Sequence, residues 1–406
     1  MEGYLVFLAI STGTFALFSL GLNLQWGFAG LINFGHVAFM TLGAYTTALL
    51  TLPGFLQEMP ERITEEVSRR PLLIQWLLQG INRLILLPLQ PLFPEQVPLA
   101  IAVFLGAILA AILGLLIGLA TLRLREDYLS IVTIGVAEIV RLVILNEEWL
   151  TRGTFGVQRF PLPGENWDPN FFGKVIAIAI LTITVLGAGG YMWQWILKRR
   201  RQVRPLSFIG WVILGFLSTL LGIAIYVSTA ASLNDYSYKS GLLLILLVVL
   251  ALLIWQLERL VHSPWGRVLK AIREDEEVPR ALGKNVFSYK VQALMLGGAI
   301  TSIAGSFYAW QQTSIYPDDF IPLTTFEAWI IVLLGGSGNN AGVLLGATIF
   351  WAYNAVTRFV LPELVPLDDA RLGALRVMVI GLLLIVLMVW RPQGILGKKE
   401  ELTLGK

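Results

Sequence analysis

The sequence predicts an all-α, polytopic membrane protein, and three observations lead to this fold class. The chain of 406 residues is 56% hydrophobic and only 14% charged, with a mean hydropathy of +0.72. Soluble domains are close to half apolar and about a quarter charged, so a soluble globule of this size could not bury so much apolar surface. The apolar residues also gather in runs of about 20, the length that a helix needs to cross a bilayer. Disordered chains are poor in aromatics and rich in charge, so disorder is excluded as well.

The predicted spans follow one another along the whole chain, and we expect one transmembrane domain over residues 1–406. The apolar runs long enough to be single spans are 4–22, 97–122, 128–146, 172–197, 205–229, 240–260, 291–311, 341–360 and 373–390. Shorter or glycine-interrupted apolar pieces cover 24–34, 36–51 and 320–335. These broken pieces bring the expected number of crossings to about ten to twelve.

The distribution of Lys and Arg among the loops predicts the orientation. The loops at 123–125, 198–204, 259–290 and 391–406 together carry 18 Lys and Arg. The loops on the opposite side carry nine Lys and Arg, and 15 acidic residues. Because cytoplasmic loops are enriched in Lys and Arg, the first set is placed inside, together with the carboxyl terminus.

Residues 52–96 form the longest insertion between predicted spans, and this orientation places it outside. Pro60 can begin a short charged helix that ends near Arg70. After Pro71, polar residues share one helical face and Leu, Ile and Trp76 the other, which is typical of a helix lying along the membrane interface. The insertion is therefore either a packing lid without a specific function or a docking surface for an external partner.

The cytoplasmic segment 262–288 begins with a clear helix signal. Ser263 and Pro264 are an N-cap residue and a first-turn residue. The apolar side of the helix that follows is formed by Val268, Leu269 and Ile272. The cations expected to face water or lipid headgroups are Arg267, Lys270 and Arg273.

A second short helix is predicted in the same segment. Asp275 can cap it, Glu276 and Glu277 suit its first turn, and Gly283 suits the position after its end. Two capped amphipathic helices close to the membrane favour a docking element for another protein. The alternative is a solvated loop that only supplies the positive charge of the inner side.

Two glycine-broken regions in different halves of the chain carry polar residues in apolar surroundings. Residues 21–51 are interrupted by four glycines, and residues 329–347 contain the run Gly-Gly-Ser-Gly-Asn-Asn. Glycine-broken apolar segments in corresponding halves point to the pathway of a transporter. Glycines that allow close helix packing are the competing interpretation. The polar residues favour a substrate pathway, whose candidates are Asn23, Gln25, Trp26, Asn33, His36, Ser337, Asn339 and Asn340.

Glu138 and Arg141 are an ionisable pair inside the predicted span 128–146. They are three residues apart, so they can pair on one helical face. Ionisable residues inside a membrane are candidates for function, whereas a pair that neutralises itself is a structural lock. Both interpretations stay open.

The sequence offers no chemistry for catalysis or metal binding. It contains no cysteine and only two histidines, which excludes thiolate and multi-histidine metal sites within the chain. It contains no G-x-x-x-x-G-K-[ST] loop and no G-x-S-x-G elbow. The net charge of +3 arises in the loops and does not argue for nucleic acid. We therefore expect a membrane permease that contacts lipid, is not an enzyme, and holds no cofactor or metal.

Several of these segments resemble those of a known family, the M-type permease subunits of bacterial ATP-binding-cassette (ABC) importers for branched-chain amino acids. The motifs are dispersed over most of the chain in the family's order, at residues 21–51, 130–141, 154–157, 263–286, 304–309 and 391–397. The resemblance does not include the insertion at 52–96, and it covers 185–230 poorly. Versions with such insertions are similar to cyanobacterial neutral amino-acid permeases.

The resemblance implies a type II-like importer permease fold in the bacterial inner membrane. It implies a homologous permease subunit as partner, two cytoplasmic ATPase subunits that bind the ATP, and an external substrate-binding protein. The substrates would be neutral or branched-chain amino acids. Many ABC permeases carry a Glu-Ala-Ala…Gly pattern in the coupling helix, and Glu277 and Gly283 keep its spacing while Val278 and Pro279 replace the alanines. The coupling residues implied are Arg273, Glu274, Asp275, Glu276, Glu277, Arg280 and Gly283.

Three alternatives stay open. Importers for urea and short amides belong to the same broad family, and no residue separates them from amino-acid importers. An ion-coupled secondary carrier would transport in vesicles without any partner, whereas an ABC permease requires the ATPase and the binding protein. A scaffold without transport activity would have tightly packed and dry glycine regions.

Overall fold

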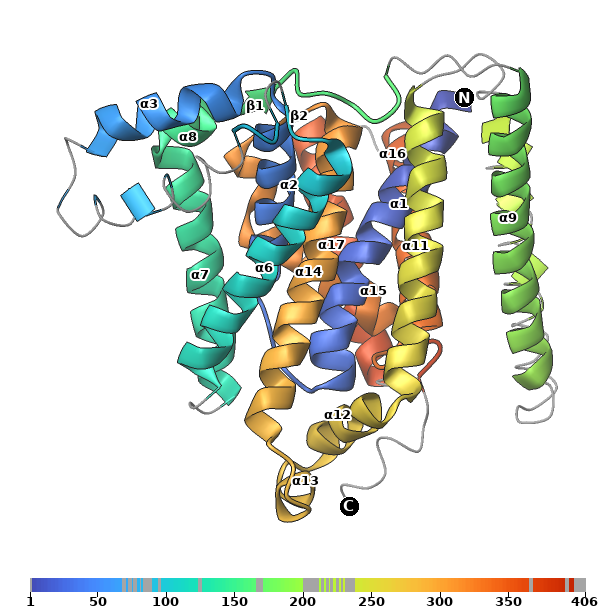
Figure 1. The fold of residues 1–406 in the computed structure, drawn as a ribbon. Helices are drawn as coiled ribbons and strands as arrows, with labels where there is room; N and C mark the ends of the chain where they lie inside the picture. Colours follow the sequence, from blue (N-terminus) through green and yellow to red (C-terminus); the bar gives the residue numbers. More distant parts are fainter. Residues whose placement is uncertain are drawn as a thin grey trace. The chain divides into compact units, whose positions relative to one another are not determined.

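The computed structural model describes residues 2–67, 71, 75, 79–80, 82, 90–93, 96–122, 126–165, 171–199, 212, 215–216, 219, 222–223, 226–227, 229–230, 238–364, 368–390 and 394–397. Nearly all ordered structure in this part of the chain is helical (Figure 1). The strands among these residues are the two-residue β1 (Val157–Gln158) and β2 (Ser314–Ile315). The predicted all-α class is confirmed.

Most of the predicted long spans coincide with helices. The helices are α1 (Glu2–Leu22), α6 (Leu99–Thr121), α7 (Glu126–Asn146), α9 (Phe171–Arg199), α11 (Tyr238–His262), α14 (Val286–Gln312), α16 (Asn340–Leu364) and α17 (Asp369–Trp390). Within the described residues, five helices are long and apolar enough to cross a membrane, or up to seven if each of two bent pairs is one span. The predicted span 205–229 lies largely outside the described residues, so the total of ten to twelve crossings stays a prediction.

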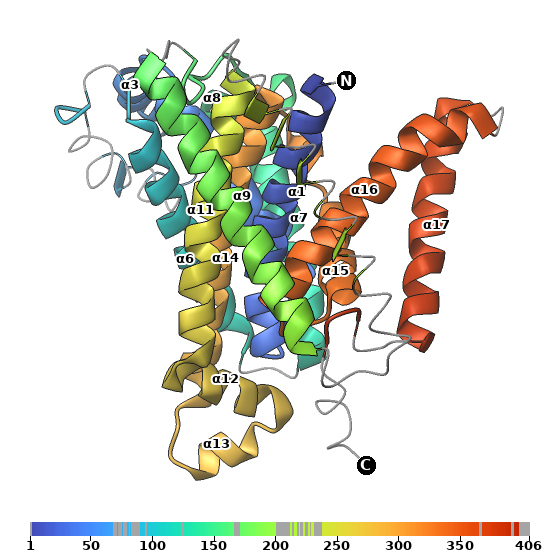
Figure 2. The same ribbon diagram turned by 90° about the vertical axis from the view of Figure 1, so that its right-hand side faces the viewer.

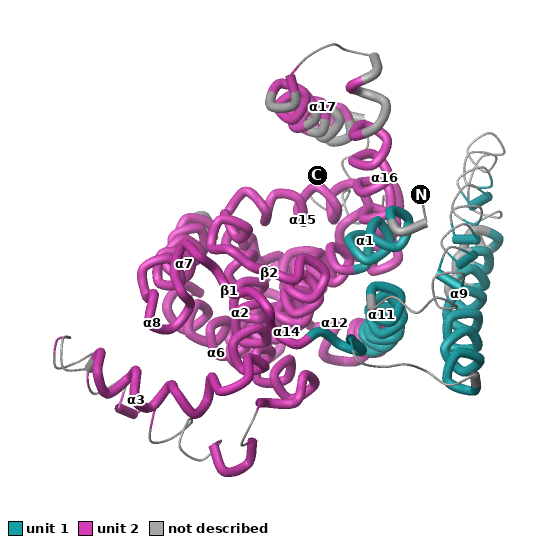
Figure 3. Tube along the Cα trace, turned by 90° about the horizontal axis from the view of Figure 1, so that it is seen from above, with its two compact units in different colours: residues 1–13, 162–256 teal, residues 14–161, 257–406 magenta. Residues whose placement is uncertain are grey.

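The chain divides into two compact units (Figure 3). The first comprises residues 1–13 and 162–256 and contains α9 and most of α11. In this unit Ala177 and Leu181 of α9 are buried. The hydroxyl oxygens of Thr182 and Tyr226 lie 3.0 Å apart.

The second unit comprises residues 14–161 and 257–406 and is built around α14. This helix packs closely against α6 and α2 (Val37–Thr51) (Figure 1). A Cβ atom at Gly43 of α2 would clash with the carbonyl of Ser302, and one at Gly305 of α14 with the carbonyl of Met40. These glycines let the two backbones approach each other, so Gly43 serves helix packing.

The two faces of α6 follow from its residue sizes. Small residues at a spacing of four are buried: Ala102, Gly106, Ala110 and Gly114. Large apolar residues at the same spacing are exposed on another face: Phe104, Ile108, Ile112 and Leu116. Such an apolar outer face is stable in contact with lipid chains and not with water.

Both predicted helix breaks are present, and both lie in the second unit. After α1 the chain forms a π-helical segment η1 (Asn23–Phe28) and an irregular stretch before α2; residues 23–36 are called the first break. Helix α15 (Pro322–Gly335) meets α16 at 116° through residues 336–339, the second break, and α17 follows α16 (Figure 2). Gly336 and Gly338 have φ angles of 110° and 74°, which favour glycine.

The start of the first helix in the 52–96 insertion differs from the prediction. Helix α3 spans Phe55–Val67, so Pro60 lies inside it and does not begin it. A proline inside a helix leaves the carbonyl four residues earlier without its N–H partner. Here the Leu56 carbonyl accepts a hydrogen bond of 2.9 Å from Gln90 Nε2 instead. The residues after Pro71 lie mostly outside the described part, so the interfacial helix predicted there stays a prediction.

Short elements join the helices at their two ends (Figure 1). Helix α7 is followed by α8 (Glu148–Thr151), η3 (Gly153–Phe155) and β1. Strand β1 pairs antiparallel with β2, with Val157 opposite Ile315, and η4 (Pro317–Phe320) comes next after β2. At the other end, α12 (Pro264–Glu274) and α13 (Glu277–Ala281) precede α14.

Candidate functional site

The two helix breaks, more than 300 residues apart in sequence, meet in space. Gly338 N donates a hydrogen bond of 2.9 Å to Asn23 Oδ1, and Asn23 Nδ2 donates one of 3.1 Å to Asn340 Oδ1. A Cβ atom at Gly27 would lie only 2.6 Å from Gly338 N, so the glycines permit this approach. We call the contact of Asn23 and Gly27 with Ser337, Gly338 and Asn340 the break junction.

Arg273, in the last turn of α12, reaches into the break junction. Its Nη1 donates to the Gly27 carbonyl at 2.5 Å, and its Nη2 donates to Ser337 Oγ at 3.3 Å. The expectation that Arg273 faces water or headgroups is therefore wrong. Amphipathic periodicity places Arg273 on the polar side of α12, but tertiary packing brings carbonyl and hydroxyl acceptors to that side.

Glu258, near the end of α11, also joins the break junction. Asn340 Nδ2 donates a hydrogen bond of 3.2 Å to Glu258 Oε1. Glu258 also lies 3.4 Å from His262 one helical turn later. Sequence reasoning did not select Glu258, although a carboxylate at the end of an apolar run, four residues before a histidine, is a usable signal.

A second polar network, fully buried, is centred on Gln25. Its Oε1 accepts a hydrogen bond of 2.8 Å from Asn33 Nδ2 and lies 3.1 Å from His36 Nδ1. Its Nε2 donates to the Leu294 carbonyl at 3.1 Å. The other ring nitrogen of His36 lies 2.6 Å from Thr301 Oγ1, a residue that sequence reasoning did not identify. Asn33 and His36 thus meet at the same Gln25 oxygen.

The remaining two pathway candidates have different surroundings. Trp26 belongs to an aromatic cluster, in which its ring centroid lies 4.5 Å from that of Trp329. Trp329 in turn donates from Nε1 to the Asn33 carbonyl at 3.1 Å. Asn339 Nδ2 donates to the carbonyl of Leu396 at 3.1 Å, in the carboxyl-terminal segment.

That carboxyl-terminal segment completes the end of α15. The backbone N–H groups of Ile395 and Leu396 donate to the carbonyls of Leu334 and Gly335, both at 2.9 Å. The last carbonyls of a helix have no partner within the helix, so the segment supplies the missing donors. Its glycine, Gly394, has a φ of 71° and packs against backbone of the second break.

The eight pathway candidates are thus distributed over connected sites at the two breaks. Their Asn, Gln, Ser and His side chains form hydrogen bonds with one another, with backbone, or with neighbouring side chains such as Arg273 and Glu258, and Asn23, Gln25, Asn33 and His36 are completely buried. A buried polar group is costly unless it is hydrogen-bonded, so these pairings account for the stability of the breaks. The role of these residues in a substrate pathway stays a prediction.

The helix caps predicted in the 262–288 segment are present. Ser263 Oγ accepts from Gly266 N at 3.4 Å, and Asp275 Oδ1 accepts from Glu277 N at 2.8 Å. Gly283, with a φ of 73°, ends α13. The N–H groups of Gly283 and Lys284 donate to the carbonyls of Arg280 and Pro279, which is the Schellman pattern.

The predicted coupling residues separate into exposed and inward-facing ones. The exposed ones are Glu274, Asp275, Glu277, Arg280 and Gly283. Glu276 forms an ion pair with Lys290 of α14, and Arg273 contacts the break junction. Two apolar side chains at α13 are exposed as well, Val278 by 52% and Leu282 by 75%. Leu269 and Ile272 are buried, as the apolar side predicts.

Glu138 and Arg141 form the predicted pair. Arg141 Nη2 lies 2.6 Å from Glu138 Oε1, and Arg141 Nη1 donates to Asp318 Oδ1 of η4 at 3.0 Å. Arg141 thereby ties α7 to the connector after β2, which favours the structural interpretation. Beside it, burial raises the pKa of Asp319 above its ordinary value, partly offset by the hydrogen bond from Tyr316 N.

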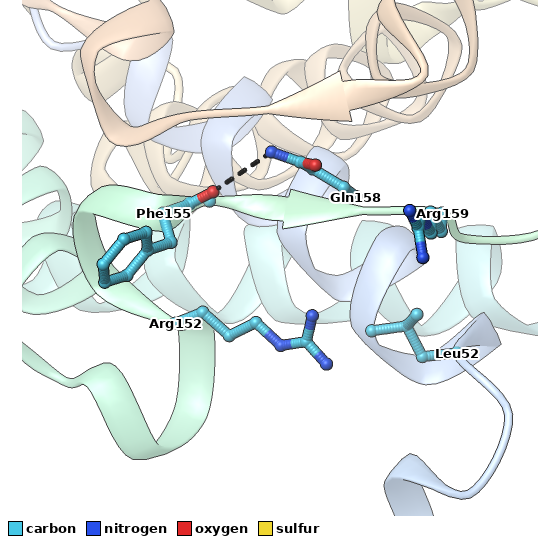
Figure 4. A pocket seen from close by; sticks show the side chains of 6 residues that line it. Leu52, Arg152, Phe155, Gln158 and Arg159 are labelled. Atoms are coloured by element: carbon cyan, nitrogen blue, oxygen red, sulfur yellow. Dashed lines mark hydrogen bonds between the residues drawn. The ribbon is translucent and has the colours of Figure 1, made fainter.

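A hollow of about 440 Å³ lies beside β1 (Figure 4). Figure 4 shows the residues around it: Arg152 from between α8 and η3, Arg159 from directly after β1, and Leu52 from the end of α2. Arg152 and Arg159 have φ angles of 63° and 58°, a conformation that is uncommon for residues with a side chain. Both arginines are exposed, and so is the neighbouring Phe155. Sequence reasoning did not select this hollow.

Comparison with known proteins relates the chain to transport permeases. The family model described as "Branched-chain amino acid transport system / permease component" matches residues 4–388. The high-affinity branched-chain amino acid transport system permease protein LivM of Salmonella typhimurium is 28% identical over 389 residues, covering 96% of this chain and 69% of that protein. The probable branched-chain amino acid transport permease protein LivM of Methanocaldococcus jannaschii is 25% identical, covering 96% and 92%. The fructose import permease protein FrcC of Rhizobium meliloti is 29% identical over 115 residues, covering 27% and 31%. No solved structure matches the chain significantly.

Proposed function

The chain belongs to the family of branched-chain amino acid transport permeases of ABC importers, and on this premise we propose that it carries neutral or branched-chain amino acids into the cell. The match of the family model to residues 4–388 carries this proposal, because it includes both breaks and the 262–288 segment. The relatives named as branched-chain amino acid permeases support the substrate class. A homologous permease subunit is the proposed partner across the pathway.

Two cytoplasmic ATPase subunits are the proposed source of energy, and the capped segment 262–288 is their proposed docking element. Its tip at α13 exposes Val278 and Leu282 next to charged residues, a combination that suits a protein surface. The chain itself is proposed to bind no ATP, metal or other cofactor and to catalyse no reaction. The segment and the carboxyl terminus are then cytoplasmic, as the positive charge of these loops predicts.

An external substrate-binding protein is the proposed partner on the opposite side. The hollow beside β1 supports this assignment, because Arg152, Arg159 and Phe155 present two positive charges and an exposed aromatic ring there. Aromatic residues and arginine are the types most often central to protein interfaces. The substrate is then proposed to pass near the break junction once the breaks open.

Reconstitution in proteoliposomes tests the transport function. The chain is combined with its partner permease, the ATPases and the binding protein, and uptake of labelled leucine, alanine, glutamine and urea is measured. Uptake of an amino acid that requires both ATP and the binding protein is expected. Uptake by this chain alone under an ion gradient would contradict the proposal, and uptake of urea alone would replace amino acids by short amides as the substrate.

A further inference from the structure

We propose that Arg273 is the positioning residue that transmits movement of the ATPase-facing segment to both helix breaks at once. This inference rests on the proposed function and assigns a residue to one of its steps. Of the coupling residues expected from the sequence, Arg273 then acts inside the permease, whereas the exposed residues at α13 contact the ATPase.

The first reason is the double contact of one guanidinium. Nη1 binds the Gly27 carbonyl of the first break and Nη2 binds Ser337 Oγ of the second, at 2.5 and 3.3 Å. The guanidinium is planar and rigid, so its two nitrogens cannot move independently. A shift of Arg273 must therefore move both breaks or give up two hydrogen bonds.

The second reason is that η1, the helical part of the first break, ends at carbonyls that require a donor. Gly27 lies in the last turn of η1, where backbone carbonyls have no following helical N–H and where the helix dipole is negative. A cationic donor is the favoured partner there. Hydrogen bonds to charged groups are stronger than neutral ones, so this contact stabilises the first break in the observed conformation.

The third reason is that glycines at both breaks leave room for Arg273. Gly30 has a φ of 74°, and a Cβ atom there would lie 3.4 Å from the Arg273 backbone. A Cβ atom at Gly338 would lie 2.9 Å from Arg273 Nη1. Lys270, one turn earlier in α12, lies over the ring of Phe28 at 5.6 Å. Helix α12 is thus fitted to the first break along its last two turns.

The fourth reason is that only a short link joins α12 to α13. Leu269 and Ile272 of α12 are buried and anchor this helix in the protein. Only Asp275 and Glu276 separate the end of α12 from α13. Asn23 also links the two breaks directly through Gly338 and Asn340. We therefore expect a displacement of α13 to be passed to α12 and, through Arg273, to both breaks, because the link between the two helices is short.

The test compares Arg273→Gln with Arg267→Gln in the complete complex in proteoliposomes. Arg267 lies on the same helix but is exposed, so it serves as the matched control. Copurification of the ATPases, ATP hydrolysis and amino-acid uptake are measured together. We expect Arg273→Gln to retain the ATPases but to lower uptake per ATP hydrolysed by about tenfold or more, because both charge-assisted hydrogen bonds of the guanidinium are lost, while Arg267→Gln stays near wild type.

A graded series separates coupling from a general loss of folding. Arg273→Lys keeps the charge but has a single ammonium, so an intermediate uptake per ATP is expected. Ser337→Ala removes only one contact, and in an Arg273→Gln background it is expected to add no further loss. Equal uptake per ATP in Arg273→Gln and wild type would overturn the proposal, and so would loss of ATPase copurification in Arg273→Gln.

A further readout does not depend on the transported substrate. Since the chain contains no cysteine, Ala341→Cys beside the break junction gives this chain one site for maleimide labelling, which is followed on the isolated band of this chain. We expect ATP to change its labelling rate in the complex with Arg273 and to leave the rate unchanged with Arg273→Gln. An equal effect of ATP on the labelling rate in the complexes with Arg273 and with Arg273→Gln would refute the role of Arg273. Failure of amino-acid uptake by the wild-type complex would refute only the proposed function.

Discussion

Gln25 shows how a single polar side chain can hold an irregular segment at membrane depth. Its two amide atoms serve Asn33, His36 and the Leu294 carbonyl, which lie on different stretches of the chain. In a bilayer, non-helical backbone persists only where protein or a water-filled cavity supplies the missing hydrogen bonds. Gln25 contributes indirectly, because it holds the Asn33 side chain, whose Oδ1 accepts a hydrogen bond of 2.9 Å from the backbone Gly35 N.

Replacing Gln25 tests whether this network is dry. Gln25→Leu would leave buried donors and an acceptor without partners, and each such group costs about 1–3 kcal/mol. We expect a clear decrease in the thermal unfolding temperature of the purified protein, while Gln57→Leu on the exposed side of α3 changes little. If both variants unfold at the wild-type temperature, water replaces the amide, and the residues around Gln25 line a wet pathway.

Arg141 is the second residue with a role that can be measured. It pairs with Glu138 in its own helix and with Asp318 in η4, and Asp318 is 84% exposed. Arg141→Gln leaves Glu138 as an unpaired charge in a membrane span, which we expect to lower stability by about 1–3 kcal/mol.

The double variant Glu138→Gln with Arg141→Gln decides the role of this pair. It removes both charges, so it is expected to be more stable than Arg141→Gln alone. Thermal unfolding and uptake are measured for all three variants. Normal stability combined with loss of uptake in the single variants would indicate a functional pair and contradict the structural lock.

At the scale of elements, the two breaks depend on backbone approach more than on helix propensity. Gly27 and Gly338 meet where any side chain would force the segments apart. By contrast, Gly189 in α9 has no atom within 4 Å of a Cβ built on it. The same residue type therefore has opposite consequences in different elements.

Glycine-to-alanine changes make that contrast measurable. Gly27→Ala is expected to open the break junction and to lower both stability and uptake, because its Cβ would lie 2.6 Å from Gly338 N. Gly189→Ala is expected to be neutral or to stabilise by up to about 1 kcal/mol, since alanine favours helix. Wild-type uptake by Gly27→Ala would show that the breaks do not need to approach each other.

At some helix ends, local sequence patterns are sufficient to predict the structure. The caps at Ser263 and Asp275 and the terminal Gly283 were predicted from neighbouring residues, and each has its expected backbone partner or conformation. Pro60 was misplaced because a proline is favourable in the first turn of a helix. Its tolerance inside α3 depends on Gln90, which is 30 residues away and provides the substitute donor.

At the scale of the whole molecule, two regions between helices expose charged and apolar side chains next to each other. The α13 tip exposes Val278 and Leu282, and the hollow beside β1 exposes Arg152 and Arg159. The proposed function requires one surface for the ATPase subunits and another for the external binding protein. These two regions are the candidates for those roles.

Changing the α13 tip tests the first of these surfaces. Val278→Asp with Leu282→Asp is expected to abolish copurification of the ATPases, and so is deletion of residues 264–283. Because both side chains are exposed, the double substitution should leave the unfolding temperature of the purified chain unchanged. Lys284→Gln, also exposed nearby, is the control. Retained copurification by the double variant would place the ATPase contact elsewhere.

The sequence alone determined the membrane environment, the positions of most spans, the two breaks and the caps of the 262–288 segment. Each of these follows from composition or from residues within a few positions of one another. Only the tertiary structure decided which polar groups meet: Asn23 with Gly338, Gln25 with Leu294, and Arg273 with both breaks. Their partners lie between 64 and 315 residues away in the sequence, and the irregular backbone at each break exposes carbonyls that no local pattern reveals. Helical periodicity assigned Arg273 to the solvent, whereas the acceptors packed against it turned it inward.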